Sequence, residues 1–102
     1  MLSMMQKYVL SKRAKKDLAN IWRYTVETWS RGQADKYVGG LLSMFPKIAD
    51  ALEKYGQSYD HVRLGYRKSQ YGKHFIFYIT QYDGTVLISR ILHEKMDYDR
   101  HL

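Results

Sequence analysis

The period of the hydrophobic residues changes near Gly56, and this change is the strongest constraint on the fold. Before it, apolar side chains recur every three or four residues, which is the spacing of one face of an α-helix. After it, they follow the two-residue period of β-strands, with Asp83-Gly84 placed between two such runs. Asp-Gly favours a tight hairpin because both central positions of that turn take positive φ. The sequence therefore predicts an α+β protein with helices and strands in separate parts of the chain.

The first helix is expected over residues 12–30. Ser11 precedes it and can act as its N-cap, because the serine hydroxyl accepts a hydrogen bond from a free backbone N–H. The apolar positions fall within about 100° of the helical wheel. They are Ala14, Leu18, Ile21, Trp22, Thr25 and Trp29. Gly32 is expected to stop this helix, since glycine readily adopts the left-handed conformation found at helix ends.

A second helix is expected over residues 33–55, which carry a broad apolar face. Gly39 and Gly40 each cost about 1 kcal/mol in a helix, and Pro46 lacks the amide hydrogen that a helix interior uses. Because Pro46 projects to the polar side, we expect a bend rather than an end. The connection between the helices is short, so they should form an antiparallel hairpin.

Four strands are expected, one before the helices and three after them. They cover residues 7–11, 65–71, 73–82 and 85–93. Both faces of the last two strands carry apolar residues, so these strands should be central in the sheet. One face should pack on the helices, and the other should be partly open or covered by residues 96–102. The expected order is β-α-α-β-β-β, an antiparallel sheet packed on an α-helical hairpin.

The 102 residues suffice for a single domain, 1–102, with residues 1–5 expected to be a flexible extension. The chain has no cysteine, which excludes disulfides, thiolate metal sites and a cysteine nucleophile. No apolar run has the length of a secretory signal or of a membrane span. These features favour the cytoplasm, and neither a membrane nor a cofactor is expected.

The net charge of +7 is concentrated in two parts of the chain. In the first part, residues 1–32, seven basic residues stand against two acidic ones. Lys12, Lys16 and Arg23 project together from the side of the first helix opposite its apolar face. Lys12, Arg13, Lys15 and Lys16 lie at the expected N-terminus of this helix, where cations oppose the helix dipole, so local stability does not explain them. They form either a solvated polar face or a docking surface for an acidic partner.

The second basic part is residues 61–82, which contain Arg67, Lys73 and His74 and no acidic residue. Arg90 stands in the middle of an expected central strand, where an unpaired arginine would be costly. Its partner would be one of the tail acids, Asp97 or Asp99. Alternatively, Arg90 is displayed on the open face of the sheet as a binding residue.

No catalytic signature is present, because the sequence lacks a phosphate-binding loop, a nucleophile elbow and a zinc-protease motif. The four histidines are spaced too irregularly for a zinc site, so no metal is expected. A metal-free ribonuclease stays open, because it needs only a base, an acid and cations for the phosphate. Residues of these types are Arg67, Lys73, His74, Arg90, His93 and Tyr98. The tyrosines on or near apolar patterns are interpreted as structural; they are Tyr24, Tyr37, Tyr55 and Tyr78.

Several segments together resemble the ParE-type toxins of the RelE/ParE toxin–antitoxin superfamily. They are Tyr8–Ser11, Asp17-Leu18, Ile21-Trp22, Gly65–Arg67, Tyr71–Tyr78 and Ile88–Asp97. The resemblance covers about residues 6–102, and the family arrangement agrees with the order of elements expected from the hydrophobic pattern.

This resemblance implies a toxin that inhibits DNA gyrase by trapping the enzyme on cleaved DNA, which is binding rather than catalysis. The implied target-binding residues are Arg67, Lys73, His74, Arg90 and His93. The first alternative is a ribosome-dependent mRNA endoribonuclease of the RelE type. Its catalytic residues would be Arg67, Arg90, His93 and Tyr98. The second alternative is an inactive homologue that serves only as an antitoxin-binding module.

The resemblance also implies a ParD-like antitoxin as partner. Its disordered segment would fold onto the toxin, and its N-terminal part would bind DNA, so that the toxin would meet DNA only indirectly. A segment that folds on binding needs a large, partly apolar groove to offset its ordering entropy. The helical hairpin is the expected surface, with Lys12, Lys16 and Arg23 at its basic margin.

Overall fold

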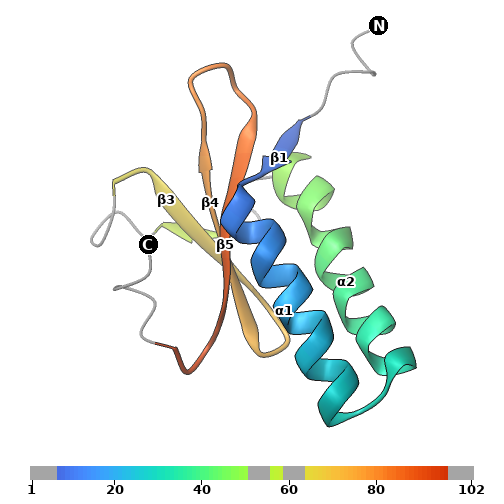
Figure 1. Cartoon of the computed structure of the whole chain (residues 1–102). Helices are drawn as coiled ribbons and strands as arrows, with labels where there is room; N and C mark the ends of the chain where they lie inside the picture. Colours follow the sequence, from blue (N-terminus) through green and yellow to red (C-terminus); the bar gives the residue numbers. More distant parts are fainter. Residues whose placement is uncertain (1–6, 51–55, 59–63, 97–102) are drawn as a thin grey trace, which may run out of the picture.

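A computed structural model describes residues 7–50, 56–58 and 64–96, in which the two helices form one layer and the strands another (Figure 1). The elements in chain order are β1 (Tyr8–Leu10), α1 (Lys12–Thr28), α2 (Arg31–Asp50), β2 (Gln57–Ser58), β3 (Tyr66–Tyr71), β4 (His74–Thr80) and β5 (Val86–His93). The α+β class and the order of the expected elements are confirmed, with the short strand β2 added. The expected extension at 1–5 and the expected helix end at Tyr55 lie outside the described residues.

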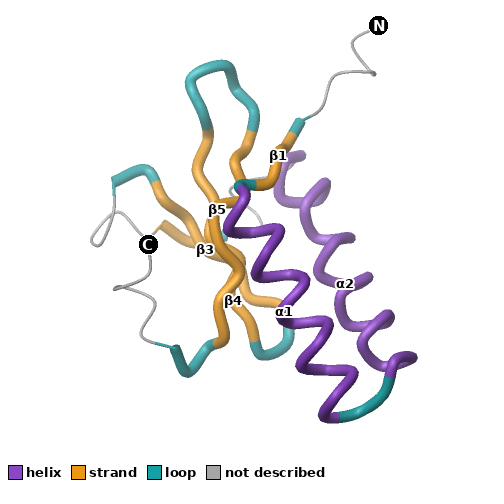
Figure 2. The backbone as a smooth tube through the Cα atoms, viewed as in Figure 1, coloured by secondary structure: helices purple, strands orange, loops and turns teal. Residues whose placement is uncertain are grey.

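The strands form one sheet in the order β1-β5-β4-β3-β2, so β4 and β5 are central as predicted (Figure 2). The neighbouring pairs from β2 to β5 are antiparallel. β1 instead runs parallel to β5, with Tyr8 opposite Val86, so the sheet is mixed rather than wholly antiparallel. The backbone N–H of Ser11 donates to the carbonyl of Ile88 at 3.0 Å, which fastens the start of α1 to β5. The direction of β1 depends on this contact between distant parts of the chain, which leaves no local signal in the sequence.

The connection between the helices also differs from the prediction. α1 ends at Thr28, and the N–H of the following residue, Trp29, donates to the carbonyl of Thr25 at 2.8 Å. Ser30 then caps the N-terminus of α2, because its hydroxyl accepts a hydrogen bond from the N–H of Gln33 at 3.0 Å. Gly32 therefore lies inside α2 instead of stopping α1. α2 continues through Pro46 to Asp50, so the prediction that this proline does not end the helix is confirmed.

The main core lies between the helices and the sheet. Its buried members are Ala14, Ile21, Leu41, Phe45, Ile48, Ile76, Tyr78, Val86, Ile88 and Ile91. Burying one large apolar side chain contributes about 1.5–3 kcal/mol, so this cluster holds the two layers together. Phe77 and Leu92 are buried in a second cluster, in which Phe77 alternates along β4 with Ile76 and Tyr78 of the main core. Both faces of the central strands are therefore apolar, as predicted.

Two aromatic residues of α1 and its C-cap do not join the core. The side chain of Trp29 is 75% exposed and that of Tyr24 is 66% exposed. The predictions that Trp29 belongs to the apolar face and that Tyr24 is structural are therefore wrong. Trp29 stands after the last helical residue, where helical spacing no longer fixes the direction of a side chain.

None of the described helices combines the length and hydropathy that a membrane span requires.

Candidate functional site

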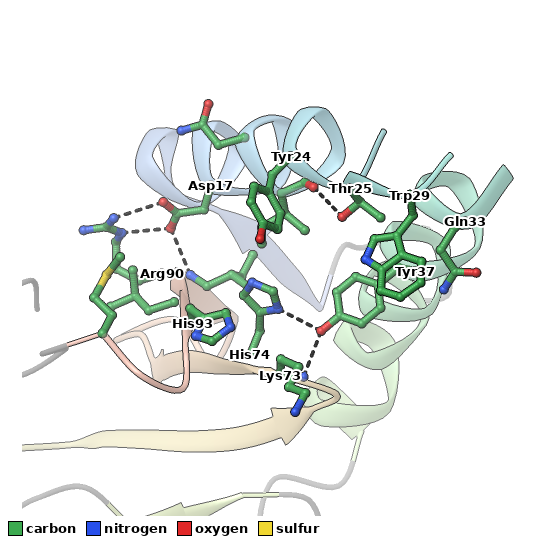
Figure 3. A pocket seen from close by; sticks show the side chains of 15 residues that line it. Asp17, Tyr24, Thr25, Trp29, Gln33, Tyr37, Lys73, His74, Arg90 and His93 are labelled. Carbon is green, nitrogen blue, oxygen red and sulfur yellow. Dashed lines mark hydrogen bonds and ion pairs between the residues drawn. The ribbon is translucent and has the colours of Figure 1, made fainter. Parts of the chain in front are cut away.

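A pocket of about 590 Å³ opens where α1 and the start of α2 face the ends of β4 and β5 (Figure 3). Four residues singled out in the sequence line it together, namely Lys73, His74, Arg90 and His93. Apolar side chains from both layers complete the lining, among them Ile21 and Ile91. The pocket thus joins cationic and imidazole groups to an apolar wall, which is the composition typical of a binding site.

Asp17 of α1 holds Arg90 in place across this pocket. The Nε of Arg90 donates to Oδ2 of Asp17 at 2.9 Å, and Nη2 donates to Oδ1 at 3.0 Å. Oδ2 also accepts from the backbone N–H of Ile91 at 2.9 Å. The side chains are only 12% exposed for Asp17 and 15% for Arg90, so the pair is largely shielded from water. The hydrogen bonds that Arg90 donates to Asp17 raise the pKa of Arg90 above its ordinary value.

A β-bulge in β5 brings the functional side chains together. Phe77 pairs with Arg90, whereas the next residue of β4, Tyr78, pairs with Ile88, so Ser89 is the additional residue. Beyond the bulge, His74 stands opposite His93, and the centroids of their rings are 5.3 Å apart. The ladder therefore places both histidines at the pocket end of the sheet.

Arg90 was expected to pair with Asp97 or Asp99, but the partner that the structure describes is Asp17. Asp97 and Asp99 lie outside the described residues, so the prediction for the tail stays a prediction. The alternative interpretation, a cation displayed on an open sheet face, is wrong, because the guanidinium of Arg90 is held by α1.

The imidazole of His74 is half-buried and bonded to Tyr37 of α2. The Tyr37 hydroxyl lies 2.7 Å from His74 Nδ1 and 3.1 Å from the carbonyl oxygen of Tyr71. Burial, followed by the neighbouring His93, lowers the pKa of His74 from 6.5 to about 4. His74 is therefore neutral at pH 7. Burial also raises the pKa of Tyr37, which keeps its hydroxyl protonated.

The low pKa of His74 predicts that the protein is less stable in mild acid. Between pH 6.5 and about 4 the unfolded chain binds a proton that the folded His74 does not, so the free energy of unfolding falls as the pH falls through this window. We expect a loss of about 2 kcal/mol after allowance for solvent screening, and full stability above pH 6.5. Urea unfolding of the wild type and of His74→Phe at several pH values measures it. The carboxylates titrate in both proteins, so identical slopes would contradict the assignment to His74.

Lys73 has only a weak partner. Its ammonium lies 3.8 Å from the carboxylate of Glu94, and its side chain is 75% exposed. An exposed ion pair of this kind contributes about 0–1 kcal/mol. The ammonium group of Lys73 can therefore leave Glu94 and bind an incoming anionic group at little cost in free energy.

Arg67, another predicted site residue, does not line the pocket. Nη2 of Arg67 donates to the carbonyl of Gly56 at 2.6 Å, and the guanidinium lies beside Tyr78. Burial raises the pKa of Tyr78, and the nearby charge of Arg67 acts in the opposite direction. Tyr98 lies outside the described residues.

The basic row of α1, defined as Lys12, Lys16 and Arg23, is exposed as predicted. Nη1 of Arg23 lies 3.4 Å from Oδ1 of Asn20, and Asn20 itself lines the pocket. One member of the basic row, Arg23, therefore contacts a residue of the pocket wall.

Sequence reasoning missed Asp17, Tyr24, Trp29 and Tyr37 as residues of the site. Asp17 carried a usable signal, since it is a lone acid among the four cations of this part of α1. The aromatic residues carried none, because apolar patterns do not distinguish a core position from a pocket wall. Across the described ranges, no three histidine, aspartate or glutamate side chains gather closely enough to hold a metal ion.

The comparisons with known proteins agree on one class. A solved structure described as the chromosomal ParDE toxin–antitoxin system from P. aeruginosa shares the fold, with a TM-score of 0.74 over 87% of this chain and 96% of that one. At 17% identity this likeness concerns the fold alone. The family described as "ParE toxin of type II toxin-antitoxin system, parDE" matches residues 8–98.

Two relatives align with this chain over nearly their whole length. Toxin ParE1 of Mycobacterium tuberculosis is 37% identical over 99 residues, which are 97% of this chain and 100% of that protein. Toxin ParE1 of Caulobacter vibrioides is 38% identical over 98 residues, 96% of this chain and 99% of that protein. These matches define the chain as a toxin of a type II toxin–antitoxin system, a class that has an antitoxin as its partner. Within that class, the chain belongs to the ParE toxin family.

Proposed function

We propose that this toxin inhibits DNA gyrase by binding the enzyme and trapping it on cleaved DNA, in the cytoplasm, and that a ParD-like antitoxin neutralises it. The main support is the match to the ParE toxin family over residues 8–98 and the 37% and 38% identity to two ParE toxins over 97% and 96% of this chain. The target-binding face would be the pocket with Lys73, His74, Arg90 and His93. Arg67 would contribute only if the target also covers the β2 edge of the sheet.

The state of the pocket residues favours binding over catalysis. Arg90 already donates two hydrogen bonds to Asp17, so its charge is largely compensated before any ligand arrives. Burial keeps the pKa of His74 at about 4, which makes it a weak base at neutral pH. An endoribonuclease needs a cation and a base that are available to the phosphate and the 2′-hydroxyl.

A supercoiling and cleavage assay with purified gyrase tests this proposal. We expect loss of supercoiling and accumulation of linear plasmid after protein denaturation. Lys73→Glu should raise the inhibitory concentration about tenfold, because it reverses a charge at the pocket. Lys47→Glu is the matched control, an equally charged change at an exposed position on α2.

Three outcomes would contradict the proposal. Unchanged supercoiling together with codon-specific mRNA cuts in induced cells would establish the endoribonuclease instead. Normal growth on expression without antitoxin would indicate the inactive homologue. Equal inhibition by both lysine variants would remove Lys73 from the target-binding face.

The basic row is the margin of the proposed antitoxin surface. Replacing Lys12, Lys16 and Arg23 by glutamate should raise the dissociation constant of the toxin–antitoxin complex about tenfold or more. Each exposed ion pair with the antitoxin would contribute about 0.2–1 kcal/mol. Calorimetric titration with the cognate antitoxin measures this change. The control, Lys36→Glu with Lys47→Glu, lowers the net charge elsewhere. A complex weakened no more by the triple variant than by this control would contradict the assignment.

A further inference from the structure

The hydrogen bonds around His74 fix which of its nitrogens carries the proton. The Tyr37 hydroxyl contacts three groups: Nδ1 of His74 at 2.7 Å, the carbonyl of Tyr71 at 3.1 Å and the N–H of Lys73 at 3.1 Å. The carbonyl can only accept, and we assign the single hydroxyl proton to it. The hydroxyl oxygen then accepts from Lys73 and from a protonated Nδ1 of His74. This tautomer leaves Nε2, at the outer edge of the ring, as a hydrogen-bond acceptor.

His93 is held in the opposite tautomer. Its Nδ1 lies 3.1 Å from the backbone nitrogen of Lys95, whose N–H donates to it. Nδ1 therefore carries no proton, and Nε2 carries the ring proton. Both rings line the pocket, and they stand opposite each other across the β4–β5 pair. The sheet side of the pocket thus offers an acceptor on His74 beside a donor on His93.

The helical side of the same pocket offers flat aromatic surface. Figure 3 shows Tyr24 and Trp29 on this side, and His74, His93 and Lys73 on the sheet side. Both aromatic side chains are largely exposed, so their faces are accessible to a ligand. A ligand that suits all these groups is planar, carries a donor and an acceptor on one edge, and has negative charge nearby for Lys73.

We propose that the pocket binds one unpaired nucleobase of a DNA strand, with its edge on His74 and His93 and its face on Trp29 or Tyr24. This inference rests on the proposed function, because a toxin that traps cleaved DNA meets bases at a strand break. Base edges present adjacent donors and acceptors, and stacking on aromatic side chains tolerates every base. Lys73 supplies the cation for a neighbouring phosphate. A protein side-chain amide also has a donor and an acceptor, but it lacks the aromatic face that Trp29 and Tyr24 would stack on.

The test compares two single strands that carry the same phosphates. One is a thymidine hexamer, and the other is a hexamer of abasic sites. We expect the purified toxin to bind the thymidine hexamer about tenfold more tightly or better, because only that strand can stack. The tighter binding should persist as salt is raised, since counterion release acts on both strands alike.

Two variants locate the base. Trp29→Ala and His74→Phe should each bring the affinity ratio of the two strands toward one, and circular dichroism verifies that each variant is folded. Trp29 is exposed, so its removal leaves the core intact. Tyr82→Ala is the matched control, because Tyr82 is a fully exposed aromatic residue that does not line the pocket, and it should leave the ratio unchanged.

The outcomes separate this inference from the proposed function. An affinity ratio of one in the wild type, or an unchanged ratio in the double variant Trp29→Ala with Tyr24→Ala, which lacks both aromatic faces, overturns the nucleobase site. If gyrase inhibition persists in that case, the pocket takes a protein side chain, and the proposed function stands. A normal ratio without any gyrase inhibition supports the nucleobase site and overturns the proposed target.

Discussion

Asp17→Ala should lower the free energy of unfolding by about 3–5 kcal/mol, which is the range for breaking one half of a buried ion pair. The substitution removes the two hydrogen bonds that Arg90 donates to Asp17 and the acceptor of the Ile91 N–H. It leaves a guanidinium with 15% exposure beside the pocket, where water only partly replaces the carboxylate. Urea unfolding followed by far-UV circular dichroism measures the loss, and the gyrase assay should show a parallel loss of inhibition.

A double variant shows how much of that loss comes from removing only one member of the Asp17–Arg90 ion pair. Asp17→Leu with Arg90→Met replaces both charges by apolar groups of similar size, and it should cost less than Asp17→Ala alone. Glu27→Ala is the matched control, because it removes an exposed acid from the same helix and should change stability by less than about 0.5 kcal/mol. If Asp17→Ala costs no more than Glu27→Ala, the ion pair does not hold α1 on β5.

The sequence was sufficient where the cause of a structure is local. The change of hydrophobic period separates helices from strands, and Asp83-Gly84 correctly marks the hairpin between β4 and β5. The expected turn with positive φ at both positions is wrong, because only Gly84 has a positive φ, of 91°. The two-sided apolar pattern of β4 and β5 identified the centre of the sheet, because only central strands bury both faces. Each of these features needs only residues that are close together in the chain.

The candidate site could be predicted only in part, because its geometry depends on a bulge. Simple counting from the pair Thr80–Val86 back along the hairpin would put His74 opposite Leu92. The additional residue Ser89 shifts the register, and His93 takes that place. Four of the predicted residues therefore line one pocket, whereas their meeting at one end of the sheet could not be derived.

The partner of Arg90 illustrates the same limit. The cost of an unpaired arginine in a central strand was visible in the sequence and correctly required a partner. Asp17 is 73 positions away in the chain, and it reaches Arg90 only because α1 crosses β5 beside the bulge. A residue pair at this separation follows from the packing of the layers, which the hydrophobic pattern leaves open.

Gly40→Ala should destabilise the protein by about 1–3 kcal/mol, although alanine is the better helix former. A Cβ atom at this position would overlap the hydroxyl end of the Tyr71 ring. Tyr71 cannot move freely, because its ring packs on that of Tyr37 with centroids 5.4 Å apart, and Tyr37 is bonded to His74. The glycine therefore lets α2 approach β3 closely enough to build the wall of the pocket. Thermal or urea unfolding measures the effect.

Gly39→Ala is the matched control on the neighbouring residue of the same helix. A Cβ atom there meets nothing within 4 Å, so alanine should stabilise α2 by about 1 kcal/mol through helix propensity alone. Opposite signs for the two substitutions would separate the requirement for close approach from backbone flexibility, which both glycines share. Combining Gly40→Ala with Tyr71→Phe should recover part of the loss, because it removes the hydroxyl that the new methyl group meets. If both single variants are stabilised instead, Tyr71 yields to the methyl group, and α2 does not depend on Gly40 for its place against β3.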